Sequence, residues 1–212
     1  MNAHTERLSL LGSAGAIEAV RDVAALAAGA APRGVVVIAH PHPLFGGSLD
    51  NKVVQTLARA FVQSGWTAVR FNFRGGGASA GAYDEGRGEL DDLLAVVAEQ
   101  APLDQPLLLA GFSFGAFVTA GAIARLHTQR PIAGAVLVGT AASRFAVPPV
   151  PTELHPQTLV VHGELDETVP LASVMDWARP QSLPVTVVPG GEHFFHGQLP
   201  LLKSLVVRHV RA

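Results

Sequence analysis

The stretch Pro106-Leu107-Leu108-Leu109-Ala110-Gly111-Phe112-Ser113-Phe114-Gly115-Ala116-Phe117 decides the fold. A short apolar run ends in Gly-x-Ser-x-Gly, and a helical pattern begins directly after it. This order of strand, sharp turn and helix is typical of a nucleophile elbow, which lifts Ser113 clear of the sheet. Gly111 and Gly115 leave room where a Cβ would strike a neighbouring element. The alternative is a chance match in a chain with 22 glycines.

Strands and helices alternate on both sides of this stretch. Continuous apolar runs predict buried strands at Gly34–Ala39, Trp66–Phe73, Ala133–Val138, Thr158–Val161 and Val185–Val188. Helical spacing predicts helices from about Ser48 or Asp50 to Gln63, and at Glu89–Glu99, Phe114–Leu126, Val169–Ala178 and Gln198–Arg211. Such alternation indicates an α/β protein with a mainly parallel sheet and helices on both faces.

Two short strands, Arg7–Leu11 and Ala16–Arg21, are expected to open the chain as a hairpin. The Ala-rich segment Val23–Ala31 fits either a loop or a longer hairpin. The length of 212 residues suits one domain spanning residues 1–212.

An elbow serine needs an acid and then a base later in the chain. The acid is expected after the strand at Thr158–Val161, where we select Asp166 because it lies in the turn before the next helix. Glu164 and Glu167 are its rivals. Asp166 could instead only cap that helix.

The base is expected after the last strand, in Pro189-Gly190-Gly191-Glu192-His193-Phe194-Phe195-His196. We select His193, in the Gly-rich turn, over His196. In such a triad His193 takes the proton of Ser113, and Asp166 orients the imidazole and stabilises its charged form.

An oxyanion hole needs two backbone N–H donors. One is expected from Phe114, directly after the nucleophile. The other is expected in the loop His40–Gly47, where Pro41 and Pro43 have no N–H to give. We select His42, with Leu44 as the alternative.

Metal sites have weak support. His40 and His42 form a His-x-His pair, but no third ligand lies at a convincing spacing. The acidic residues between Asp84 and Asp92 are expected to favour the positive end of a helix, and Arg74 is expected to pair with a nearby carboxylate. We expect no metal and no cofactor.

The substrate pocket is expected to include Phe112, Phe194 and Leu44. The segment Gly139–Gln157, where a helical lid could be inserted, is too short for a packed subdomain. A shallow, open cleft and a short acyl group are therefore expected.

Composition and charge argue against several other classes of protein. The net charge of −2 and the isoelectric point near 6.5 provide no basic surface for nucleic acid. The absence of cysteine excludes disulfides and a cysteine nucleophile. No apolar run reaches the ~20 residues that span a bilayer, and the N-terminus does not resemble a signal peptide. A cytoplasmic protein that binds a small ester, without a membrane partner, is expected; the sequence does not indicate an oligomeric state.

These motifs resemble those of the α/β-hydrolase superfamily, in particular small lidless bacterial proteins related to dienelactone hydrolases and esterases. The matching segments are His40–Gly47, Asn51–Val54, Arg70–Gly75, Gly111–Gly115 and Glu192–Phe195. The resemblance implies a sheet of about eight strands that begins with an antiparallel hairpin. It departs from true dienelactone hydrolases at the nucleophile, which is cysteine in them.

The expected activity is that of a serine esterase working through an acyl-enzyme without a cofactor. Two alternatives remain: a peptidase or amidase with the same triad, and a non-catalytic binding module on this scaffold.

Overall fold

An eight-stranded sheet forms the centre of the computed structural model, which describes residues 5–24 and 30–211. Its strand order is β1-β2-β4-β3-β5-β6-β7-β8. The strands are β1 (Thr5–Gly12), β2 (Gly15–Asp22), β3 (Val35–Ala39), β4 (Thr67–Phe71), β5 (Leu107–Phe112), β6 (Gly134–Val138), β7 (Thr158–Gly163) and β8 (Val185–Val188). β1 pairs antiparallel with β2, and β2 antiparallel with β4, while every other pairing is parallel.

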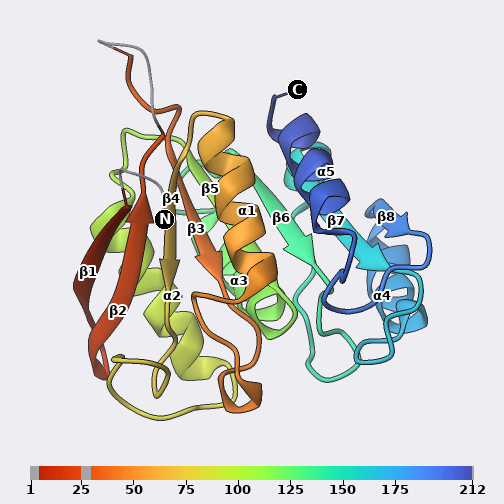
Figure 1. The fold of residues 1–212 in the computed structure, drawn as a ribbon, viewed down its shortest axis with the longest axis horizontal. Helices are drawn as coiled ribbons and strands as arrows, with labels where there is room; N and C mark the ends of the chain where they lie inside the picture. Colours follow the sequence, from red (N-terminus) through yellow and green to blue (C-terminus); the bar gives the residue numbers. More distant parts are fainter. Residues whose placement is uncertain (1–4, 25–29, 212) are drawn as a thin grey trace.

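Helices cover both faces of the sheet (Figure 1). They are α1 (Lys52–Gln63), α2 (Arg87–Gln100), α3 (Phe114–Leu126), α4 (Leu171–Ala178) and α5 (Leu199–Arg211). α1 and α5 lie side by side on one face, and α2, α3 and α4 pack on the other. Within the described residues, none of these helices combines the length and the apolar character needed to cross a bilayer.

The buried strands explain this two-sided cover. Every residue of β3, β4, β5 and β6 is buried, so both faces of these strands need apolar partners. Alternate side chains along these strands therefore pack into two separate hydrophobic cores, one on each face of the sheet. Val37 and Leu109 contribute to the core beneath α2 and α3, whereas Val36 and Ile38 contribute to the core beneath α1 and α5.

The predicted fold class is confirmed: the sheet is mostly parallel, begins with a hairpin and carries no lid. Between β6 and β7 the only helical element of the described chain is one short 3₁₀ helix, Thr152–Gln157. The predicted starts of α1, Ser48 or Asp50, are four or two residues early, because the side chain of Asn51 accepts the N–H groups of Val53 and Val54 and so caps the helix there. The uncertain segment Val23–Ala31 lies partly outside the described residues.

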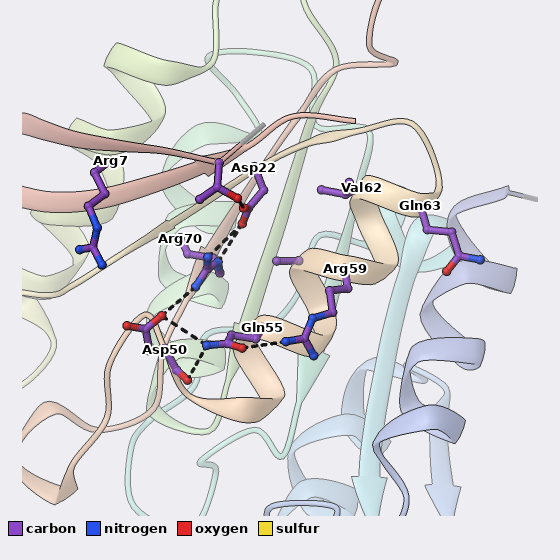
Figure 2. A pocket seen from close by; sticks show the side chains of 10 residues that line it. Arg7, Asp22, Asp50, Gln55, Arg59, Val62, Gln63 and Arg70 are labelled. Carbon is purple, nitrogen blue, oxygen red and sulfur yellow. Dashed lines mark hydrogen bonds and ion pairs between the residues drawn. The ribbon is translucent and has the colours of Figure 1, made fainter. Parts of the chain in front are cut away.

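Arg70 joins the hairpin to the rest of the sheet. From β4 its guanidinium donates two hydrogen bonds to Asp22 of β2, at 3.1 and 3.0 Å, and one to the carbonyl of Leu49 at 2.7 Å. Both charged side chains are largely buried, and Thr5 donates to the other oxygen of Asp22 at 2.6 Å. Figure 2 shows this pair at the side of a cavity of about 580 Å³ between the hairpin and α1.

We predict that Arg70→Ala lowers the free energy of unfolding by about 3–5 kcal/mol, because it leaves the Asp22 carboxylate buried without its cation. Urea unfolding followed by circular dichroism measures this change. The matched control is Arg87→Ala, since Arg87 pairs with Asp84 and Glu85 on the exposed surface and its loss should leave the free energy of unfolding nearly unchanged. Equal effects of the two substitutions would contradict this account of the hairpin.

Candidate active site

Ser113 occupies a strained turn between β5 and α3. Its backbone angles are φ 58° and ψ −117°, in a region that non-glycine residues rarely adopt. A Cβ on Gly111 would lie 2.3 Å from the carbonyl oxygen of Gly115, and a Cβ on Gly115 would lie 2.4 Å from that of Ala39. Both glycines of the motif are therefore required by close backbone contacts, and the geometry is that of the predicted elbow.

Asp166 lies in the turn after β7. Its Oδ1 accepts the N–H groups of Thr168 at 3.0 Å and Val169 at 2.7 Å, which leaves Oδ2 free to point elsewhere. The carboxylate is buried. Because α4 begins only at Leu171, Asp166 closes its own turn rather than capping the helix.

His193 lies in the loop after β8 and contacts both other residues. Its Nδ1 is 2.7 Å from Oδ2 of Asp166, and its Nε2 is 3.0 Å from Oγ of Ser113. A carboxylate can only accept, so Nδ1 carries the proton and Nε2 is free to accept from the serine hydroxyl. The structure thus brings the three predicted side chains into one hydrogen-bond chain.

The rival residues Glu164, Glu167 and His196 take no part in this chain of hydrogen bonds. Glu164 accepts the N–H of Gly190 at 2.9 Å, and Glu167 is exposed. His196 is exposed and contacts Glu192 at 3.2 Å. None of these side chains touches Ser113 or His193 through a hydrogen bond within the described residues.

The loops that carry Asp166 and His193 are joined through their backbones. The N–H of Leu165 donates to the carbonyl of Gly191 at 2.8 Å, and that of Glu164 to the carbonyl of Val188 at 3.0 Å. A Cβ on Gly163 would lie 2.4 Å from the Gly191 carbonyl oxygen. This close approach fixes the distance between the acid and the base.

Two N–H groups near Ser113 fit the predicted oxyanion donors. Phe114 is the first residue of α3, so its N–H has no partner within the helix. No hydrogen bond within residues 5–24 and 30–211 uses the N–H of His42, whereas that of Leu44 donates to the His42 imidazole at 3.3 Å. The His42 ring packs 4.9 Å from the ring of Phe114. These contacts favour the N–H of His42 over that of Leu44 as the second predicted oxyanion donor.

His40 holds the start of the same loop in place. It is fully buried, and its Nε2 accepts the N–H of Phe73 at 3.0 Å, which ties the end of β3 to the chain after β4. Burial lowers the pKa of His40 to about 4. The ring is therefore neutral near pH 7, as its role as an acceptor requires, and the hydrogen bonds do not indicate a metal ligand.

The predicted pocket residues lie in different environments. Phe194 is 43% exposed and, with Leu165, Glu167, Thr168, Glu192 and His193, lines a cavity of about 310 Å³. Leu44 is exposed in the loop after β3. The prediction for Phe112 is wrong, because this side chain is fully buried and packs behind the His193 ring, 4.9 Å between centroids.

The acidic residues near α2 accept hydrogen bonds from the loop that precedes this helix. Asp92 accepts from Arg74 at 2.8 and 3.1 Å, as predicted, and Glu89 accepts the N–H groups of Asp84 and Gly86. Within the described residues, no group of three or more His, Asp or Glu side chains is arranged to hold a metal ion.

One buried residue beside Asp166 was not identified from the sequence. His162, on β7, is fully buried, and its Nε2 lies 3.5 Å from Oδ2 of Asp166. Its signal was a histidine directly after the apolar run Leu-Val-Val of β7, four positions before Asp166.

Comparisons with known proteins agree with this geometry. A family model described as "Serine aminopeptidase, S33" matches residues 30–155, which is more than half of the chain. An uncharacterized protein of Rickettsia prowazekii is 41% identical over 87 residues, an alignment that spans 40% of this chain and 37% of that protein.

Solved structures match over nearly the whole chain. A serine hydrolase without a lid from Xanthomonas campestris is 36% identical over 100% of this chain and 95% of its own, with a TM-score of 0.85. A serine hydrolase homologue from Coxiella burnetii is 36% identical over 96% of both chains, with a TM-score of 0.77. A putative α/β-hydrolase from Agrobacterium tumefaciens is 28% identical over 97% and 95%, with a TM-score of 0.80.

The elbow, the sheet and these matches lead to one assignment. The chain belongs to the family described as serine aminopeptidase, S33, and is a lidless serine hydrolase of the α/β-hydrolase superfamily.

Proposed function

We propose that the protein hydrolyses short-acyl carboxylic esters through a Ser113–His193–Asp166 triad and an acyl-enzyme intermediate. The observation that carries the proposal is the unbroken hydrogen-bond chain from Asp166 Oδ2 through His193 to Ser113 Oγ. Each contact has the donor and acceptor that nucleophilic catalysis requires.

The reaction follows from this arrangement. Nε2 of His193 takes the hydroxyl proton as Ser113 Oγ attacks the ester carbonyl, and Asp166 stabilises the imidazolium that forms. The N–H groups of Phe114 and His42 hold the oxyanion. His193 then gives the proton to the departing alcohol, and water releases the acid from the acyl-enzyme in a second round of the same steps.

A peptidase or amidase activity is the second candidate, and the description of the matching family favours it. Comparing p-nitrophenyl butyrate with aminoacyl p-nitroanilides on one preparation separates the two readings. A kcat/KM that is higher for the anilides would replace the esterase proposal.

We predict that Ser113→Ala or His193→Ala lowers kcat/KM for p-nitrophenyl butyrate by roughly 10⁴-fold or more, and Asp166→Asn somewhat less. A fluorophosphonate probe should label Ser113 in the wild type and not in Ser113→Ala. The controls are His196→Ala and Glu164→Gln, which should stay near the wild-type rate. A folded wild type that is neither labelled nor active would favour the binding-module alternative.

The His42 N–H can be tested apart from its side chain. His42 has φ −53°, close to the value that proline imposes, so His42→Pro removes the N–H with little change of φ. We predict that kcat of His42→Pro is about 10²- to 10³-fold lower than that of His42→Ala, the loss expected for one oxyanion donor. Both variants lack the imidazole, so equal rates would exclude His42 as the donor.

The acyl preference follows from the short segment between β6 and β7, which carries no helical lid in the described chain. With only one short 3₁₀ helix between β6 and β7, little protein surface is expected to cover a long acyl chain. Each additional methylene contributes about 0.8 kcal/mol of binding free energy, but only where apolar protein surface covers it. We predict that kcat/KM is higher for p-nitrophenyl acetate and butyrate than for dodecanoate and palmitate at constant detergent. A maximum at twelve or more carbons would disprove the short-acyl assignment.

A further inference from the structure

The buried imidazole of His162 lies beside the acid of the proposed triad. His162 is on β7, and its side chain is 0% exposed. Its Nε2 is 3.5 Å from Oδ2 of Asp166, the same oxygen that accepts from His193 at 2.7 Å. His162 cannot touch a substrate from this position, but it lies next to the atom that orients the base.

A second contact ties His162 to the turn that holds Asp166. Nε2 of His162 is 2.9 Å from the carbonyl oxygen of Val169, so Nε2 carries the proton and donates it. The N–H of the same Val169 donates to Oδ1 of Asp166 at 2.7 Å. Val169 is therefore held at its N–H by the acid and at its carbonyl by His162, which anchors the turn to the rigid strand β7.

Packing alone does not account for a histidine at this position. Its Nδ1 is buried and has no hydrogen-bond partner within the described residues, which makes the ring costly compared with an apolar side chain. Burial also lowers the pKa of His162, so the ring stays neutral and keeps the tautomer that donates from Nε2.

We propose that His162 is a positioning residue that holds the Asp166 turn so that Oδ2 faces Nδ1 of His193. This inference rests on the triad proposed above. Without the His162–Val169 hydrogen bond the turn is free to shift, and the contact between Asp166 and His193 loosens. The affected quantity is the rate of the chemical steps rather than the affinity for the ester.

Three substitutions separate this role from simple packing. In His162→Gln, the side-chain amide reaches about as far as Nε2 and can still donate to Val169. In His162→Asn the amide ends near the position of Nδ1, and in His162→Leu no donor remains. We predict that kcat for p-nitrophenyl butyrate falls about 10- to 100-fold in the Leu and Asn variants with KM nearly unchanged. The Gln variant should retain most of the wild-type kcat.

A double-mutant cycle with Asp166→Asn tests whether His162 acts through the acid. If it does, His162→Leu slows turnover much less in the Asp166→Asn background than in the wild type, because little orientation is left to lose. General damage to the fold would reduce the rate by the same factor in both backgrounds. The rate of fluorophosphonate labelling at Ser113 provides a second readout that does not depend on the ester chosen, and near-UV circular dichroism verifies the fold.

The outcomes distinguish this inference from the proposed function. An active wild type with an equally active His162→Leu variant, an additive cycle, or a Gln variant no better than the Asn variant would overturn the role of His162 and leave the triad intact. A wild type that neither turns over esters nor reacts with the probe would overturn both. Should His162→Leu fail to fold, the comparison of the two polar variants, Gln and Asn, decides alone.

Discussion

The contact between the first turn of α3 and the end of β3 is the constraint on which the site depends. Gly115 lies so close to the carbonyl oxygens of Ala39 and His40 that no side chain fits between them. This contact forces the sharp turn at Ser113 and aligns the start of α3 with the loop that carries His42. One packing contact between backbones thus sets the positions of Ser113, Phe114 and His42, which are the nucleophile and the oxyanion donors of the proposed mechanism.

A similar contact governs the other half of the site. The backbone of Gly163 lies against the carbonyl of Gly191, so the loops after β7 and β8 are held together independently of the side chains of the proposed triad. Since β7 and β8 are parallel neighbours, both loops emerge at the same edge of the sheet. Asp166 and His193 therefore meet although 27 positions separate them in the chain.

Two buried, neutral histidines, His40 and His162, hold the backbone of the loops around this site. His40 accepts the N–H of Phe73, and His162 donates to the carbonyl of Val169. Burial lowers the pKa of both, so each ring keeps one donor and one acceptor near neutral pH. His193 differs because its Nδ1 contacts the carboxylate of Asp166, which orients the ring in the proposed mechanism.

The sequence by itself determined the order of elements, the elbow at Ser113 and the places of Asp166 and His193, because apolar periodicity and glycine spacing are local properties of the chain. It favoured Asp166 over Glu164 and Glu167 from the position of Asp166 in the turn, but the contact of Asp166 with His193 depends on how two loops pack and is seen only in the tertiary structure. The burial of Phe112 and the contact of His162 with Asp166 are likewise long-range. Only the tertiary structure decided them, because which face of a strand meets a neighbouring loop is fixed by sheet order and register rather than by the residues of that strand alone.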